Sequence, residues 1–246
     1  DAAGRAAATV TQTRYGKWVA QLVWVAQHQT LQETPLGRLG RDTKVTLVVL
    51  FSGVLLAYLI GLGLGLATAL VDRRGADVVV FGVLTVLFAI PPAVTGVLAL
   101  SLTGPDPGVL LAALVVALSV AVFPARHERA RTAELLSESF VLATRARGIT
   151  PPKLALRCFR HSIGLVVAML SMEPQAALAA CLVAEQVFGL PGIGQSLVVA
   201  FAERDVGYLM MLVLASAVIA TLLIFAADVI TANLHPKLRG RMWERR

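Results

Sequence analysis

The stretch VTLVVLFSGVLLAYLIGLGLGLATALV, residues 45–71, contains no charged side chain. A transmembrane helix needs about 20 mostly apolar residues, so this stretch is long enough for one span. Four further apolar runs follow it, at residues 78–105, 108–125, 163–184 and 206–227. Leucine and alanine fill these runs without strict alternation, which favours helices over the strands of a barrel. The sequence therefore predicts an all-α, polytopic bundle of transmembrane helices.

The composition of the whole chain agrees with a membrane protein. Apolar residues make up 57% of the 246 positions, charged residues make up 15%, and the mean hydropathy is +0.76. Soluble domains contain about 45–50% apolar and 25% charged residues. The net charge of +7 would also suit a nucleic-acid-binding protein. The basic residues flank the apolar runs and form no single basic face, so we expect no nucleic-acid partner.

Basic residues gather on one side of the predicted bundle, in the turn between the first two runs, in a loop over residues 126–162 and in the C-terminal tail. Cytoplasmic loops are enriched in Lys and Arg, so we expect this side and the C-terminus to be cytoplasmic. The chain then divides into an external, partly amphipathic segment (1–44), a transmembrane domain (45–240) and a cytoplasmic tail (241–246). Arg38, Arg41 and Lys44 argue weakly against this orientation.

The basic loop (residues 126–162) reads VLATRARGITPPKLALRCFRHSI at residues 141–163. Strong helix formers fill residues 132–147, and Gly148 suits a left-handed helix end. Thr150 and Pro151 suit the start of a second helix, over residues 153–161. These signals predict two helices with a sharp turn at Gly148. Such a hairpin could lie on lipid headgroups or dock a soluble partner.

Several motifs resemble one known family. Ala143–Gly148, with the helix break and second helix after it, resembles the EAA loop of ABC-importer membrane subunits, in the version of dipeptide, oligopeptide and nickel importer permeases. EQVFGLPGIG, residues 185–194, closely resembles that family's segment after its fifth helix. Residues 90–96 resemble its third-helix pattern, and residues 235–239 resemble its closing Asp-Pro-Arg motif. The resemblance covers most of residues 45–240.

The chain departs from the family pattern at several points. Leu142-Ala143-Thr144 stands where Glu-Ala-Ala names the loop, Val166 stands near the usual proline, and His235 replaces the closing aspartate. Family members have six helices, whereas five apolar runs are visible here. Residues 1–44 look like the family's external segment between helices one and two. We therefore expect that the first helix is missing from this sequence.

The resemblance implies partners and a mechanism. A cytosolic ABC ATPase would bind the turn at Gly148, a second, homologous permease would complete the pore, and an extracytoplasmic binding protein would deliver a peptide, nickel or a similar small solute at the bacterial cytoplasmic membrane. ATP and Mg²⁺ would bind the partner, because this chain has no phosphate loop and is expected to be no enzyme. The expected ATPase-coupling residues are Ala143, Arg145, Arg147, Gly148, Ile149, Leu154 and Arg157.

Candidate pathway or gate residues lie in and after the fourth run. Glu173 is the only charge in that run, and ionisable groups within spans usually face the bundle interior or water. A break at Pro174 would let Gln175 join it, whereas the alternative is a protonated Glu173 bonded to a neighbouring helix. Glu185 is expected at the outer membrane boundary, as a gate or a contact for the binding protein. The turn residues expected to cap the bundle outside are Phe188, Pro191, Gly192 and Gly194.

Two other functions remain open from the sequence. One is a gradient-driven secondary transporter that uses Glu173 and the Pro91-Pro92 break, and the other is a membrane scaffold that anchors a cytosolic protein by the basic loop. Cys158 and Cys181 are expected not to meet, so we infer no disulfide, no metal site and no cofactor on this chain. The three glycines Gly61, Gly63 and Gly65 resemble a packing face of small residues.

Overall fold

The computed structural model describes residues 34–71, 74–104, 108–138, 154, 156, 158–160 and 174–234. Its elements in chain order are α3 (Pro35–Val71), α4 (Arg74–Ala89), α5 (Pro92–Thr103), α6 (Val109–Val120), α7 (Val122–Ser137), α10 (Pro174–Phe188), α11 (Ile193–Ala202) and α12 (Val206–Leu234). No strand occurs in these described ranges. The predicted all-α bundle is confirmed. The predicted tail, residues 241–246, lies outside the described residues.

The longest helix, α3, is the axis of the bundle. Its 37 residues correspond to a rod about 55 Å long. It begins at Pro35, well ahead of the predicted start at Val45, so the end of the predicted external segment is helical. Thr34 explains the early start, because its Oγ1 accepts the backbone N–H of Gly37 at 3.1 Å and caps the first turn, with Pro35 at a favoured position.

The described helices supply as many candidate spans as the sequence predicts. α3 and α12 are each long and apolar enough to cross a membrane alone. Three bent pairs, α4 with α5, α6 with α7, and α10 with α11, pass the same test together, with bends of 101°, 51° and 65°. If each bent pair is one span, five spans result. The second apolar run is thus no straight helix, since proline lacks the N–H that would continue α4 through Pro91-Pro92.

The helix predicted over residues 132–147 differs in the structure. Thr132 lies within α7, which already begins at Val122. The helix ends at Ser137, because Glu138 adopts an extended conformation with φ −71° and ψ 144°. The Ser137 hydroxyl donates to the carbonyl of Glu134 at 2.7 Å, a local bond that competes with helix continuation. Residues 139–153 lie outside the described part of the chain. The described residues 154, 156 and 158–160 are helical, as predicted for the second helix of the loop.

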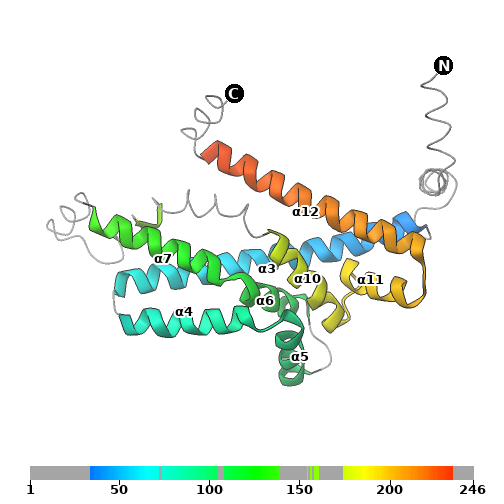
Figure 1. The fold of residues 1–246 in the computed structure, drawn as a ribbon, viewed down its shortest axis with the longest axis horizontal. Helices are drawn as coiled ribbons and strands as arrows, with labels where there is room; N and C mark the ends of the chain where they lie inside the picture. The colour runs from blue at the N-terminus through cyan, green and yellow to red at the C-terminus, as the bar shows by residue number, and fades with distance from the viewer. Residues whose placement is uncertain are drawn as a thin grey trace, which may run out of the picture.

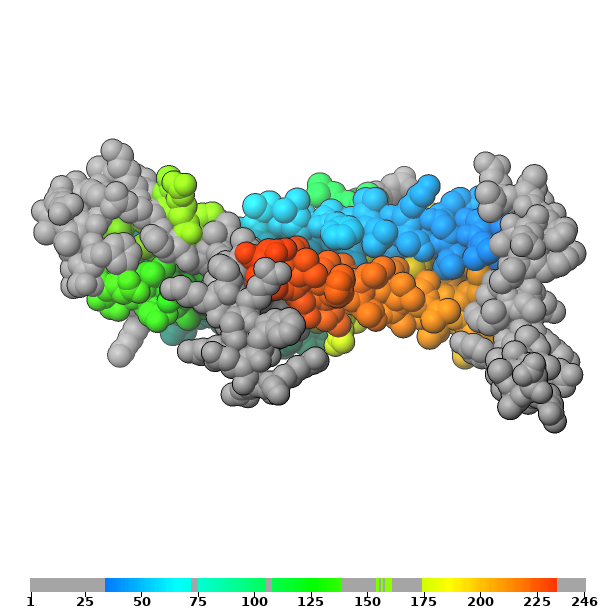
Figure 2. Space-filling model, turned by 90° about the horizontal axis from the view of Figure 1, so that it is seen from above, coloured from blue at the N-terminus to red at the C-terminus, as the bar shows by residue number. Residues whose placement is uncertain are grey.

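The apolar core lies where α6 and α10 pack against α3. Its fully buried side chains include Val49, Leu50 and Ala57 of α3, Ala112, Val115 and Val116 of α6, and Ala177, Cys181 and Ala184 of α10. Most of these side chains are small, which brings the helix backbones close together, as is usual in membrane bundles. α12 lies alongside α3 (Figure 2) and leaves much of its apolar surface exposed, including Val213, Leu222 and Phe225.

The bundle has two distinct ends (Figure 1). The start of α3, α11 and the start of α12 lie together at one end. The end of α3, the start of α4 and the end of α7 lie together at the opposite end. α7 carries the first part of the basic loop, residues 126–137, and ends here, so this second end is called the basic-loop end below.

Candidate functional site

Leu154 is the only described member of the predicted ATPase-coupling set; the others, Ala143, Arg145, Arg147, Gly148, Ile149 and Arg157, lie outside the described residues. Leu154 is 6% exposed and, with Cys158, packs against Leu66 of α3 and Leu136 of α7. It therefore faces the bundle, contrary to the expectation of an outward contact. Leu156, two positions further along a helix, is 59% exposed and presents apolar surface to solvent instead.

The predicted gate residues separate in the structure. Glu173 lies outside the described residues, and Gln175 is exposed at the start of α10. Phe188 is part of the apolar core. The remaining four residues meet where α10 turns into α11, a region called the α10–α11 corner (residues 185–194) below. They are Glu185, Pro191, Gly192 and Gly194.

Glu185 forms the polar centre of the α10–α11 corner. Its side chain is fully buried within this chain, with 0% exposed, and its role as a gate or as a contact for the binding protein stays a prediction. Its Oε2 accepts the backbone N–H of Gly194 at 2.7 Å. The first N–H groups of a helix have no partner within the helix and carry partial positive charge. The Glu185 carboxylate therefore closes the start of α11.

Thr46 of α3 completes this corner from the opposite side. It is fully buried, and its Oγ1 accepts the backbone N–H of Ile193 at 2.9 Å. Its hydroxyl also interacts with the Glu185 carboxylate. The Cys181 thiol lies 3.6 Å from both the Thr46 carbonyl and Glu185 Oε1. The start of α11 is thus held by groups from α3 and α10 together.

The glycines of the corner are required by close approach. A Cβ at Gly194 would lie within 3.0 Å of the Leu182 backbone, and a Cβ at Gly192 would lie within 3.0 Å of the Glu185 carboxyl group. Real Cβ atoms do not approach so closely. Gly194 therefore makes a tight backbone-to-helix contact, whereas Gly192 lies against the end of the Glu185 side chain; the sequence predicted only a permissive turn.

Gly194→Ala is expected to lower the free energy of unfolding by about 1–3 kcal/mol, the usual cost of overpacking a close contact. The obstructing atoms belong to the Leu182 backbone and cannot rotate away. Thermal unfolding of the purified protein in detergent would measure the loss. Gly82→Ala is the matched control, because a Cβ there meets nothing within 4 Å. Equal melting temperatures for the two variants would contradict the close contact.

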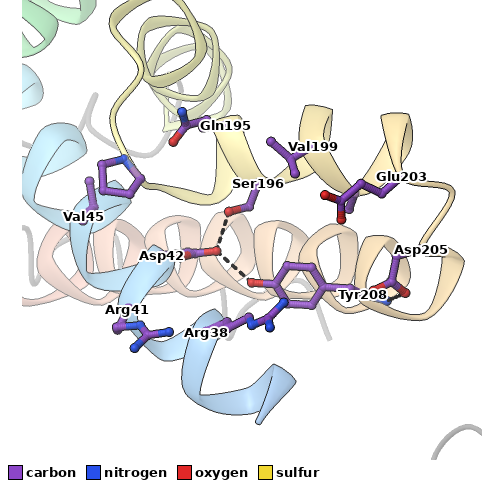
Figure 3. Close-up of a pocket in the computed structure, with 12 residues that line it drawn as sticks. Arg38, Arg41, Asp42, Val45, Gln195, Ser196, Val199, Glu203, Asp205 and Tyr208 are labelled. Carbon is purple, nitrogen blue, oxygen red and sulfur yellow. Dashed lines mark hydrogen bonds between the residues drawn. The ribbon is translucent and has the colours of Figure 1, made fainter. Parts of the chain in front are cut away.

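Asp42 joins three helices beside this corner. It is only 9% exposed, and its Oδ2 accepts the hydroxyl of Ser196 of α11 at 2.5 Å and the hydroxyl of Tyr208 of α12 at 2.8 Å (Figure 3). We call these three residues the Asp42 junction. One carboxylate therefore fixes the positions of α11 and α12 against the first turns of α3.

A cavity of about 500 Å³ adjoins the Asp42 junction. Arg38 and Arg41 of α3 line one part of it, and Glu203 and Asp205 at the turn between α11 and α12 line another (Figure 3). Gln195, Ser196 and Tyr208 contribute further polar groups, and Pro191 of the α10–α11 corner also lines it. Ligand pockets in proteins span about 300–1,000 Å³, so the cavity is large enough for a small solute.

A second, apolar cavity of about 410 Å³ lies between α3, α6, α10 and α12. Its lining includes Leu50, Val54 and Tyr58 of α3, Pro174 and Ala177 of α10, and Leu223 and Ala227 of α12. Pro174, which lines this cavity, directly follows Glu173, the acid that the sequence predicts to line the pathway. An almost wholly apolar surface can let a solute pass without holding it tightly.

The basic-loop end is built on a close contact between α3 and α7. A Cβ at Gly61 or Gly65 would lie within 3.0 Å of atoms of the α6–α7 segment, including the Ala125 backbone. A Cβ at Gly63 would meet nothing within 4 Å. The predicted packing face is thus real at Gly61 and Gly65, four residues apart on one side of the helix, and wrong at Gly63. Gly61 and Gly65 are called the glycine face below.

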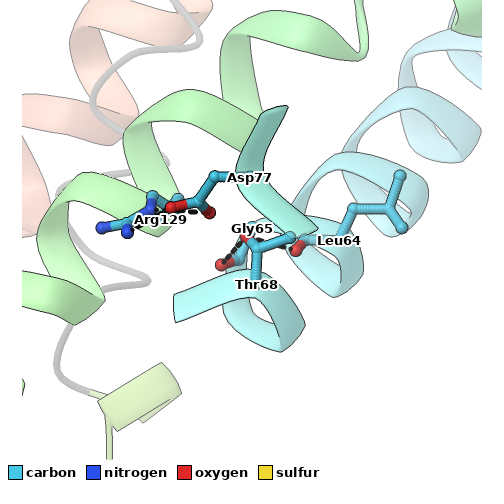
Figure 4. Close-up of polar contacts among 5 residues, drawn as sticks. All are labelled: Leu64, Gly65, Thr68, Asp77 and Arg129. Carbon is cyan, nitrogen blue, oxygen red and sulfur yellow. Dashed lines mark hydrogen bonds and ion pairs between the residues drawn. The ribbon is translucent and has the colours of Figure 1, made fainter. Parts of the chain in front are cut away.

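Polar groups fix α7 at the same end. Arg129 of α7 forms a two-pronged ion pair with Asp77 of α4, with Nη2–Oδ2 at 2.6 Å and Nε–Oδ1 at 3.1 Å (Figure 4). Buried Glu128 accepts the hydroxyl of Thr132 at 2.9 Å through its Oε1. Facing them, Thr68 of α3 donates to the carbonyls of its own helix (Figure 4). The ion pair therefore ties α7 to α4, in addition to the contact of α7 with α3 at the glycine face.

Breaking the Arg129–Asp77 pair is expected to lower the free energy of unfolding by about 0.5–1 kcal/mol, the range of partly exposed ion pairs. Exchanging the two charges, by Arg129→Asp with Asp77→Arg, should recover part of the loss in a double-mutant cycle. Glu134→Gln is the control, because its pair with Arg131 lies within α7 and joins no two helices. Losses that simply add in the charge exchange would show that the pair does not couple α7 to α4.

The Asp42 junction and the Thr46 contact were not predicted from the sequence. Asp42 precedes the first apolar run, where no helix was expected, and Thr46 is the second residue of that run. A signal was nevertheless present, because Asp42, Thr46, Val49, Gly53, Ala57, Gly61 and Gly65 recur every three to four residues and are all buried in α3. Such a period marks one face of a helix. Extending this period backwards from the glycines would have placed Asp42 on the packed face.

Residues 34–240 match the family described as the inner membrane component of binding-protein-dependent transport systems. The metal-staphylopine import system permease protein CntB of Staphylococcus aureus (strain Mu50) is 33% identical over 138 residues, which cover 56% of this chain and 44% of that protein. The glutathione transport system permease protein GsiC of Salmonella choleraesuis is 27% identical over 79% of this chain and 68% of that protein. The di/tripeptide transport system permease protein DppB of Pseudomonas aeruginosa is 28% identical over 47% of this chain and 34% of that protein.

The family match begins at the first described residue of the bundle and includes the α10–α11 corner, the Asp42 junction and the glycine face. These features were recognised from their geometry, and the match places all of them inside one family domain. The chain spans less than half of the length of the staphylococcal relative and about two thirds of the glutathione permease. The chain belongs to the family of binding-protein-dependent inner membrane transport components, the permeases of ABC importers.

Proposed function

We propose that this chain forms half of the translocation pathway of an ATP-driven importer and is moved by a cytosolic ABC ATPase through the basic loop. The observation that carries the proposal is the family match over residues 34–240, which spans the whole described bundle and the basic loop. No ATP-binding machinery is expected on this chain, so the energy must enter from a partner. A second permease would supply the other half of the pathway.

The packing at the basic-loop end supports the transfer of force. The chain runs from α6 through a 51° bend into α7, which carries the first part of the basic loop, and then into the rest of that loop. α7 packs closely against α3 at the glycine face and is tied to α4 by the Arg129–Asp77 pair. A displacement of the loop would therefore move α7 and α3 together, because packed interiors are dense and yield little to compression.

The length of α3 supports transmission to the far end of the bundle. α3 is one uninterrupted helix from the glycine face to Asp42. At Asp42 it holds α11 and α12 by two short hydrogen bonds. We infer that a displacement at the basic-loop end tilts or slides α3 against α11 and α12 at the Asp42 junction. The basic-loop end and the C-terminus would face the cytoplasm, and the Asp42 junction would face the extracytoplasmic binding protein.

The class of solute that we propose is based on the names of the relatives. These proteins are named for the import of metal-staphylopine, glutathione and di- or tripeptides. We propose a short peptide or a similar small solute as the cargo of this chain. The mostly apolar cavity between α3, α6, α10 and α12 supports a pathway with few polar contacts to the cargo.

The proposal is tested by uptake into proteoliposomes that contain the co-purified transport complex, with radiolabelled alanyl-alanine and glutathione as separate probes. We expect uptake of at least one probe to require ATP on the cytoplasmic side and the binding protein on the other, and to be indifferent to a protonophore. Uptake that ignores ATP and collapses with the protonophore would identify a secondary transporter. Co-purification of a cytosolic protein without uptake of either probe would favour a scaffold.

Gly148→Val tests the coupling through the basic loop. The sequence places Gly148 at a turn that favours a left-handed conformation, which valine adopts at high cost. We expect the variant complex to assemble but to lose uptake and the stimulation of ATP hydrolysis by the binding protein. Gly63→Val, at an open position of α3, is the control and should keep both activities. Full uptake and stimulation in Gly148→Val would remove the turn from the mechanism.

A further inference from the structure

The cavity beside Asp42 carries charges of both signs on different helical elements. Arg38 and Arg41 come from the first turns of α3, whereas Glu203 and Asp205 come from the turn between α11 and α12 (Figure 3). These four side chains line one cavity of about 500 Å³. A solute with separated positive and negative ends would find an opposite charge at each end of this space.

The charged side chains that line this cavity form no ion pair with other described residues. The ion pairs among the described residues are Arg129–Asp77 and Arg131–Glu134, neither of which lies near the cavity. Asp42 and Asp205 are exceptions, because Asp42 Oδ2 accepts the two hydroxyl groups of the Asp42 junction and Asp205 Oδ1 accepts the backbone N–H of Tyr208 at 3.0 Å. Within the described part of the chain, the guanidinium groups of Arg38 and Arg41 and the Glu203 carboxylate therefore remain available to a ligand.

We propose that this cavity binds a small zwitterion, an amino acid or a short peptide, with its carboxylate at Arg38 and Arg41 and its ammonium group at Glu203 and Asp205. Arginine is suited to the first task, since its planar guanidinium matches a carboxylate with two parallel hydrogen bonds. Carboxylates at the α11–α12 turn are suited to the second. Gln195 also lines the cavity, and its amide could bond a peptide group between the two ends.

The charge pattern distinguishes this site from simpler alternatives. A binding site for anions alone would not place Glu203 and Asp205 beside the arginines, and a binding site for cations alone would not include Arg38 and Arg41. A ligand that spans the space would touch α3 and the α11–α12 turn at once. It would thereby reinforce the contact that Asp42 makes between the same elements. The inference rests on the proposed function, because it names the class of solute that the importer would meet at this end.

The experiment measures binding to the purified transport complex in lipid nanodiscs, without the extracytoplasmic binding protein. Radiolabelled L-alanyl-L-alanine is the probe, and unlabelled alanine, N-acetyl-alanyl-alanine and alanyl-alanine amide are the competitors. We expect saturable binding, with each blocked peptide competing about threefold to tenfold less well, the range for one charge contact in a partly exposed site. Competition by free alanine shows whether one amino acid is long enough to reach both charged walls.

Variants assign each end of the ligand. Arg38→Gln combined with Arg41→Gln should abolish the preference for a free carboxylate, and the corresponding double lysine variant should retain it. Glu203→Gln should abolish the preference for a free amino group. Lys44→Gln is the matched control, since Lys44 is exposed on the same helix but does not line the cavity. Thermal unfolding of each variant confirms that it is folded, which is expected because the changed side chains are exposed.

The outcomes separate this inference from the proposed function. Absence of saturable binding, or equal competition by blocked and free peptides, overturns the zwitterion site; if ATP-driven uptake persists in that case, the proposed function stands. Loss of the preferences in Lys44→Gln as much as in the arginine variants also overturns it. Selective binding in a complex that shows no ATP-driven uptake supports the site and contradicts the proposed function instead.

Discussion

Glu185→Ala is expected to lower the free energy of unfolding by about 3 kcal/mol or more, because it removes a buried hydrogen-bond acceptor and leaves a cavity in its place. The Gly194 N–H would lose its partner at the start of α11, and the interaction with the Thr46 hydroxyl would be lost at the same time. Thermal unfolding in detergent measures the change. Glu185→Gln keeps the volume and one acceptor oxygen, so its loss should be about half as large.

Gln186→Ala is the control for this prediction. Gln186 is the next residue of α10, and its side chain is exposed. Its truncation should leave the melting temperature nearly unchanged, as usual for surface positions. If Glu185→Ala melts like Gln186→Ala, Glu185 does not hold the corner. The prediction that Glu185 is a gate residue is independent of this result.

Gly65→Val is expected to separate α7 from α3 and to abolish coupled transport, with a loss of unfolding free energy of about 2–3 kcal/mol from overpacking. A Cβ at this position already meets the Ala125 carbonyl, Glu128 and the Arg129 backbone, and valine adds two methyl groups. The obstruction lies at residues 125–129 in the first half of α7, where the basic loop begins. We therefore expect ATP hydrolysis to continue without uptake in the assembled variant complex.

Gly63→Val separates packing from composition in this test. It makes the same chemical change two positions away, on the open side of α3. Uptake and melting temperature should stay at the level of the unmodified complex. Equal damage from the two substitutions would mean that helix propensity, and not the α3–α7 contact, sets the effect.

The helical class and the number of spans could be predicted because they depend on run length and charge. Each apolar run is long enough to satisfy its backbone within a helix, and in lipid no other local solution is open to it. The Pro91-Pro92 break was also visible, because proline interrupts helical hydrogen bonding wherever it stands. The 101° bend at that break could not be predicted from the sequence, because the angle depends on how α5 packs against α6 and α10.

Burial of polar residues could not be predicted from local sequence. Glu185 follows an apolar run and has the pattern of a boundary residue, yet the start of α11 folds back over it and encloses it. Asp42 stands between exposed basic residues, and only the tertiary contact with Ser196 and Tyr208 gives it a role. Leu154 likewise has an apolar pattern that suits either a partner or the bundle, and the neighbouring Leu66 and Leu136 decide between them.

The central claim is that a separate ATPase moves this permease through the turn of the basic loop. A photoreactive amino acid placed at residue 149, directly after Gly148, tests it in the intact membrane complex. We expect illumination to yield an adduct with a protein that carries a phosphate-binding loop, in an amount that changes when ATP is added. The claim is contradicted if residue 149 is reached by a membrane-impermeant label from outside the cell, or if no nucleotide-hydrolysing protein is captured.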